Sequence, residues 1–154
     1  ETALQFLDGE RLVYDLYCGA GTLSLAASLY GEEVIGIELN PQAICDAQEN
    51  ALLNQRKNVR FFQGDTGTVL AQLDGKPNAV IVDPPRAGLD ENALNQIIKL
   101  APEKIIYVSC NPLTQSENIR VLEQAGYALI SVQGVDQFPH TPHIESVAFL
   151  RRCS

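Results

Sequence analysis

Residues 15–25, "DLYCGAGTLSL", decide the fold of this chain. A short apolar run at 12–16 ends there and leads through Gly19 and Gly21 into a helix-forming segment. Glycines let the backbone pass close to a ligand, and the start of the helix behind them favours negative charge. In open α/β sheets this strand-to-helix turn is the ligand crevice. The stretch therefore predicts an α/β domain with a ligand at the carboxyl end of its first strand.

The same strand-to-helix pattern repeats along most of the chain. Apolar runs rich in Val, Ile, Tyr or Phe end near Gly, Asp, Asn or Pro, and predict strands at 12–16, 34–38, 59–63, 79–83 and 104–109. Helical segments lie between them. One begins at Asn40 and Pro41, another at Asp90, and a third at Asn111 or Thr114 before Gly126 ends it. In the first of these helices one face is shared by Ile44, Ala47, Ala51 and Leu52. This alternation predicts a parallel sheet covered on both faces.

The end of the chain departs from that pattern. Residues 127–138, "YALISVQGVDQF", and 146–152, "SVAFLRR", read as two strands joined by a loop without a helix. A parallel return would need a longer crossover, so we expect antiparallel pairing at one edge of the sheet.

The composition limits the classes of protein to which this chain can belong. The 154 residues, 45% hydrophobic and 19% charged, suit one globular domain, and no apolar run approaches the roughly 18 residues of a membrane helix. Four cysteines without a CxxC pair, and only two histidines, predict free thiols in a cytoplasmic protein and no metal site. The net charge of -8 argues against a freestanding nucleic-acid binder. Without a leader or an initiator Met, the chain is expected to be a domain of a longer protein.

Two acidic residues suggest an adenosine ligand. Glu38 ends the second predicted strand, where a carboxylate can accept both ribose hydroxyls, and Asp65 follows the third strand, where it could meet the adenine. Ser24 stands at the third glycine position of the dinucleotide fingerprint, which argues against NAD. A generic glycine turn is the alternative, because G-x-G alone is a weak signal.

Residues 82–88, "VDPPRAG", follow the fourth predicted strand. Two consecutive prolines make this segment rigid, which suits a loop that holds a planar group at a fixed height. Asp83 supplies an acceptor and Arg86 a fork of donors. A simple proline turn is the alternative, but the position beside the glycine loop favours a functional loop.

Residues 108–112, "VSCNP", place a cysteine where the fifth predicted strand ends. Cys110 there gains exposure and the dipole of the following helix, which favour a thiolate nucleophile. For Cys18, Cys45 and Cys153 we expect the commoner fate, a buried core thiol. The loop "DQFPHTPHIESV", residues 136–147, carries Glu145 near a histidine. The carboxylate of Glu145 could act as a general base; the alternative is that it is only a solvated loop carboxylate.

Together with "IGIELNPQAI" and "FFQGD", these motifs closely resemble the S-adenosylmethionine-dependent RNA 5-methyluridine methyltransferases over essentially the whole chain. The pair "SCNP" and "HIESV" is more specific than the glycine loop. The resemblance implies a Rossmann-like class I methyltransferase fold, with a mostly parallel seven-stranded sheet, an antiparallel last strand and helices on both faces.

The resemblance also implies roles for individual residues. Cys110 matches a nucleophile that adds to uracil C6, and Glu145 matches the base that removes the C5 proton. Arg86 and His143 match substrate-binding positions. The S-adenosyl-L-methionine contacts would come from Tyr17, Gly19, Gly21, Thr22, Glu38, Asp65 and Asp83. Thr22 stands where some relatives have Asn.

The expected partner is ribosomal or transfer RNA. Family members usually carry an RNA-binding β domain and a central segment upstream, sometimes with an iron–sulfur cluster, and a cofactor-binding glutamine before the first strand. None of these lies within residues 1–154, so we expect this chain alone to bind cofactor weakly and to methylate poorly. Two alternatives stay open. One is a methyltransferase that uses "DPPR" on an amino group and needs no cysteine; the other is a non-catalytic cofactor- or RNA-binding module.

Overall fold

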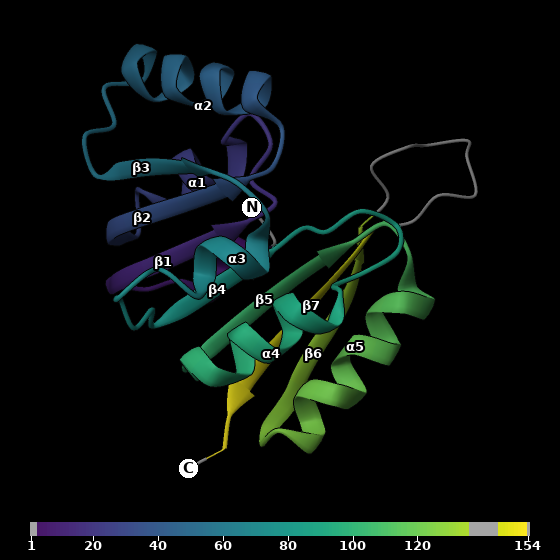
Figure 1. Ribbon diagram of the computed structural model, residues 1–154. Coiled ribbons are helices and arrows are strands. Elements are labelled where there is room, and N and C mark those ends of the chain that lie inside the picture. Colours follow the sequence, from purple (N-terminus) through teal and green to yellow (C-terminus); the bar gives the residue numbers. More distant parts are fainter. Residues whose placement is uncertain (1–2, 136–144, 154) are drawn as a thin grey trace.

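The computed structural model describes residues 3–135 and 145–153, and its centre is a seven-stranded sheet (Figure 1). The strand order is β3-β2-β1-β4-β5-β7-β6. Pairing is parallel from β3 through β5, whereas β7 is antiparallel to both β5 and β6. The strands are β1 (Glu10–Leu16), β2 (Gly31–Glu38), β3 (Val59–Gln63), β4 (Ala79–Val82), β5 (Lys104–Ser109), β6 (Tyr127–Val135) and β7 (Glu145–Arg152). The mostly parallel sheet with an antiparallel last strand is thus confirmed.

Helices cover both faces of this sheet, as expected. They are η1 (Leu4–Phe6, a 3-10 helix), α1 (Thr22–Ala27), α2 (Pro41–Leu53), α3 (Thr66–Leu70), α4 (Glu91–Leu100) and α5 (Pro112–Gln124). One apolar core joins the sheet to α3, α4 and α5, and a second joins its other face to α1 and η1 (Figure 1). The order of the strands reverses between β1 and β4, so their carboxyl ends flank the topological switch point where such sheets bind ligands.

The helix starts follow the predicted caps. Asn40 accepts hydrogen bonds from the backbone N–H groups of Gln42 and Ala43, and Asp90 caps α4 through Ala93. Asn111, rather than Thr114, caps α5 by accepting from the N–H of Leu113. Each side-chain oxygen satisfies a donor that the first helical turn leaves unpaired.

Several element boundaries differ from the sequence prediction. β1 begins at Glu10 and β2 at Gly31, because the parallel ladder continues into polar residues through the pair Glu10–Gly31. β4 ends at Val82, one residue early. The five-residue helix α3 was not predicted, since so short a helix shows no 3.6-residue period.

Some burial predictions were also wrong. Leu52 is 78% exposed, whereas the other members of its predicted face, Ile44, Ala47 and Ala51, are buried. Cys18 is buried as expected, but Cys45 and Cys153 are exposed, so they are not core thiols. All four cysteines are free.

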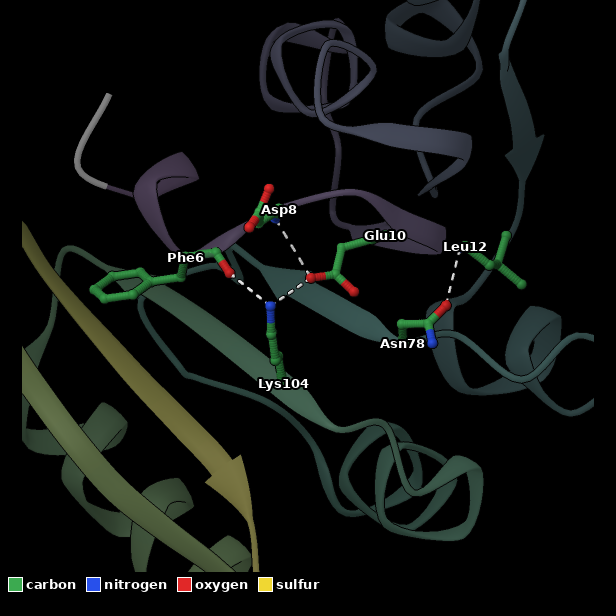
Figure 2. Close-up of polar contacts among 6 residues, drawn as sticks. All are labelled: Phe6, Asp8, Glu10, Leu12, Asn78 and Lys104. Carbon is green, nitrogen blue, oxygen red and sulfur yellow. Dashed lines mark hydrogen bonds and ion pairs between the residues drawn. The ribbon is translucent and has the colours of Figure 1, made fainter.

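A largely buried ion pair links β1 to β5 at the amino ends of the parallel strands (Figure 2). Lys104 Nζ on β5 lies 2.5 Å from Glu10 Oε1 on β1 and 3.1 Å from the carbonyl oxygen of Phe6. Nearby, Asn78 Oδ1 accepts the N–H of Leu12 at 3.2 Å. These contacts link η1, β1, the start of β4 and β5 at the end of the sheet opposite the glycine loop.

Within the described residues, no helix is both long and apolar enough to span a membrane. The same part of the chain contains no group of three or more His, Cys, Asp or Glu side chains arranged to hold a metal ion.

Candidate cofactor and catalytic site

The glycine loop lies between β1 and α1 and is pressed against α2 and β3. Gly21 has a φ of +81°, and a Cβ atom there would stand 2.9 Å from Phe61 Cζ and 3.1 Å from Ala47 Cβ. Asn50 on α2 donates to the carbonyl oxygen of Ala20 at 3.1 Å. A side chain therefore fits poorly at Gly21, which lets the loop pack closely against α2 and β3.

Glu38 joins the glycine loop to the turn after β2. Its Oε2 accepts the N–H of Gly19 at 3.0 Å and its Oε1 accepts the N–H of Asn40 at 2.9 Å. A carboxylate has about four acceptor sites, so each oxygen can still accept a further hydrogen bond. The two backbone bonds hold the half-buried carboxylate in one orientation.

Asp15 lies fully buried beneath the glycine loop. Ser24 Oγ donates to its Oδ2 at 2.5 Å, while Oδ1 has no hydrogen-bond partner among the described residues. Burial raises the pKa of Asp15 to about 7, although the Ser24 bond acts in the opposite direction. Sequence reasoning placed Asp15 in this turn without giving it a role. The only available signal was an acidic residue within a buried strand.

Asp65 begins α3 at the same edge of the sheet. Its Oδ1 accepts from both the N–H and the hydroxyl of Thr68, at 2.9 and 2.7 Å, and these bonds lower its pKa. The N–H of Gly64 donates to the carbonyl oxygen of Glu38 at 2.9 Å, which brings Asp65 close to the end of β2. The exposed carboxylate keeps its other oxygen for a ligand.

Tyr17 and Thr22 flank the glycine loop. Tyr17 adopts a left-handed φ of 64°, and burial raises its pKa to about 12. Thr22 is exposed at the first position of α1.

Asp83 follows the buried strand β4 and begins the "DPPR" loop. It reaches solvent, yet the protein around it excludes enough water to raise its pKa, and the negative charge of Glu145 acts in the same direction. Together they raise the pKa of Asp83 to about 6. The two carboxylates are thus near enough for their charges to repel each other.

Helix α5 holds the "DPPR" loop in place. The carbonyl oxygen of Arg86 accepts from Asn111 Nδ2 at 3.0 Å and from Thr114 Oγ1 at 3.1 Å. Asn118 accepts from the N–H of Leu89 at 2.8 Å and donates to its carbonyl oxygen at 3.2 Å. The Arg86 side chain stays exposed. Sequence reasoning missed Asn118, because nothing in the helix pattern marks it.

Cys110 and Glu145 lie just beyond the ladder that joins two neighbouring strands. The pairing of β5 with β7 ends at Ser109 and Ser146; Cys110 follows Ser109, and Glu145 precedes Ser146. Both residues are half-buried, and Cys110 lies between the end of β5 and the start of α5. The register thus brings the two residues to the same end of the β5–β7 ladder. His143 lies outside the described residues.

The candidate residues therefore gather at the end of the sheet where the parallel strands have their carboxyl ends. Gly19, Glu38, Asp83 and Cys110 follow or end β1, β2, β4 and β5, and Glu145 begins the antiparallel β7 beside them. A half-buried thiol, a carboxylate at the same end of the β5–β7 ladder and a glycine-rich loop can support nucleophilic addition to a ring bound beside a second ligand.

Residues 3–153 match the family described as tRNA (Uracil-5-)-methyltransferase. The chain belongs to this family. It is 47% identical over 148 residues to an uncharacterized RNA methyltransferase of Protochlamydia amoebophila, covering 94% of this chain and 34% of that protein. It is 44% identical over 142 residues to another from Caldanaerobacter subterraneus, covering 92% and 32%. The chain thus spans about a third of the length of these relatives.

Solved structures share the fold of this chain. The Pyrococcus abyssi tRNA (uracil-54, C5)-methyltransferase in complex with S-adenosyl-L-homocysteine is 34% identical, with a TM-score of 0.85, over 97% of this chain and 36% of that one. An rRNA methylase of Streptococcus thermophilus has a TM-score of 0.78 at 12% identity, over 99% of this chain and 92% of that one, and shows the fold alone.

Proposed function

We propose that this chain is the catalytic domain of an RNA (uracil-C5) methyltransferase that uses S-adenosyl-L-methionine. The observation that supports the proposal is the register of β5 and β7, because Cys110 follows and Glu145 precedes the last pair, Ser109 and Ser146. A thiol and a carboxylate at adjacent positions suit a reaction that needs a nucleophile and a base on neighbouring atoms of one ring.

The residues around the glycine loop suit an adenosine cofactor with a charged tail. Glu38 has free acceptor sites for the ribose hydroxyls, and Asp65 has a free oxygen for the exocyclic amine of the adenine. The glycine loop lies close against α2 and β3, where a Cβ atom on Gly21 would collide with Ala47 and Phe61. Beneath the loop, the buried Asp15 Oδ1 is available to a water that bridges it to the charged end of the ligand.

The chemistry assigns one task to each of the two central residues. The Cys110 thiolate forms a bond to C6 of uracil, and the electrons of the C5–C6 double bond move toward the C4 carbonyl oxygen, which makes C5 nucleophilic. When bound, S-adenosyl-L-methionine supplies an electrophilic methyl group on a positively charged sulfur. Glu145 then takes the proton from C5. The electrons of that C–H bond restore the C5–C6 double bond and expel the Cys110 thiolate.

The substrate is proposed to be a uridine in ribosomal or transfer RNA. A paired uridine would have to leave its stack before C6 could reach Cys110. The net charge of -8 gives this chain little attraction for phosphates, so we assign most of the RNA affinity to segments outside residues 1–154, consistent with the greater length of the relatives. The free thiols suit a cytoplasmic enzyme.

The test uses the full-length protein, S-adenosylmethionine and RNA in which the target carries 5-fluorouridine. Fluorine at C5 cannot leave as a proton, so the RNA should stay covalently joined to the enzyme. The adduct should survive denaturing electrophoresis and disappear in Cys110→Ala, whereas Cys153→Ala, at an exposed cysteine just after β7, should keep it. Methyl transfer to ordinary RNA without an adduct would instead favour an amino-group methyltransferase. The absence of both the adduct and methyl transfer would favour a binding module.

A further inference from the structure

Gln115 is a buried amide that joins the two strands leading to Cys110 and Glu145. It lies in the first turn of α5 and is only 2% exposed. Its Nε2 donates to the carbonyl oxygen of Tyr107 on β5 at 2.8 Å and to that of Ser146 on β7 at 3.4 Å. Its Oε1 accepts from Ser146 Oγ at 2.5 Å. With donors and acceptor all engaged, the amide has a single favourable orientation.

These contacts lie where the ladder between the strands ends. Ser109 and Ser146 form the last pair, and Ser146 Oγ also lies 3.5 Å from the carbonyl oxygen of Ser109. Cys110 and Glu145 are one residue farther on, beyond that last pair. The Gln115 amide therefore braces α5, which begins just after Cys110, against both strands at the point where the two functional residues leave the β5–β7 ladder.

Packing alone does not require an amide here. A buried amide is costly unless every hydrogen bond is made, and an apolar side chain of similar volume would fill the same space without that cost. The gain from the amide is geometric, because its bonds fix the distance between the ends of β5 and β7. A nucleophile at C6 and a base at C5 act on bonded atoms of one ring, and a misplacement of about 1 Å can cost about 100-fold in rate.

We propose that Gln115 is a positioning residue that sets the placement of Glu145 relative to Cys110, acting through Ser146. This inference rests on the proposed function of the same site. It adds a residue that touches neither ring nor cofactor, and whose loss should slow the chemistry of the bound complex rather than weaken binding.

The experiment compares Gln115→Met with wild type in the full-length protein. Gln124→Met is the matched control, because Gln124 is exposed at the other end of the same helix. With ordinary RNA and saturating S-adenosylmethionine, the single-turnover rate per folded molecule should fall about 10- to 100-fold in Gln115→Met. Affinity for S-adenosylhomocysteine should stay within about twofold of wild type, and the control should match wild type in both measurements.

Ser146→Ala removes the same contact with a smaller change. It should reproduce much of the loss, and the double variant should lose less than the two single losses multiplied, because both act through one contact. If Gln115→Met fails to fold, the single-turnover rate of Ser146→Ala tests the inference instead. A wild-type rate per folded molecule in whichever variant folds would overturn the inference. Absence of the 5-fluorouridine adduct in wild type would overturn the proposed function instead.

Discussion

Ser109 on β5 and Ser146 on β7 face each other in antiparallel register, although 37 positions separate them along the chain. The pair brings together two motifs that the sequence keeps far apart, since Cys110 follows the first serine and Glu145 precedes the second. Around them, the "DPPR" loop and the glycine loop lie at the same edge of the sheet. The predictions below separate the roles of these neighbouring groups.

Loss of the proposed base should trap the reaction after addition. Glu145→Gln keeps the shape of the side chain but cannot accept the C5 proton, so turnover should fall about 10²- to 10⁴-fold. A covalent enzyme–RNA complex should accumulate on ordinary uridine RNA, measured by denaturing electrophoresis with labelled RNA. Glu123→Gln, at an exposed position of α5, is the control. Normal turnover in Glu145→Gln would assign the proton transfer to another group.

Glu38 should matter for cofactor binding and little for chemistry. In Glu38→Gln one acceptor oxygen becomes an NH₂ group, and a hydrogen bond to a charged group contributes about 1.5–3 kcal/mol. Affinity for S-adenosylhomocysteine should therefore fall about 10- to 100-fold, measured by titration calorimetry. Glu33→Gln changes the same strand at a surface ion pair with Arg60 and should bind normally. Equal losses in the two variants would argue against a specific contact.

Alanine substitutions at Gly21 and Gly9 distinguish the cost of a left-handed backbone from the cost of a steric clash. Both have positive φ, +81° and +65°, but a Cβ at Gly9 meets nothing within 4 Å, whereas at Gly21 it meets Phe61 at 2.9 Å. Gly9→Ala should lower the free energy of unfolding by about 1–2 kcal/mol. Gly21→Ala should lower it further, in the same denaturant titration, because the ring must also shift. Identical losses would mean that Phe61 moves aside without cost.

The buried Asp15 should make stability depend on pH. Its pKa is raised from 3.8 to about 7 in the folded state, so between those values the folded state keeps a proton that the unfolded state has lost. Stability should thus fall as pH rises from about 4 to about 7. Asp15→Asn should melt at a higher temperature than wild type at pH 7.5, and the difference should shrink toward pH 4. A difference that is constant with pH would mean that Asp15 is not protonated when buried.

Local signals predicted much of this fold. The apolar runs located the central strands, and Asn40, Asp90 and Asn111 marked helix starts, because a cap and its helix are neighbours in sequence. The helix α3 escaped prediction because five residues show no helical period. The polar starts of β1 and β2 escaped it because pairing between the two strands, not local pattern, creates them. The contacts of Gln115 and Asn118 were equally invisible, because their partners lie on other elements.

The sequence by itself determined the strand–helix order, the glycine turn and the types of residue available for chemistry. Only the tertiary structure decided that Cys110 and Glu145 lie at the same end of the β5–β7 ladder. That outcome depends on β7 taking the place between β5 and β6. The physical reason is burial: residues Ser146 to Leu150 of β7 are buried on both faces, whereas β6 is largely exposed and suits the edge. Which strand takes an interior position in the sheet is therefore decided only when all strands are assembled.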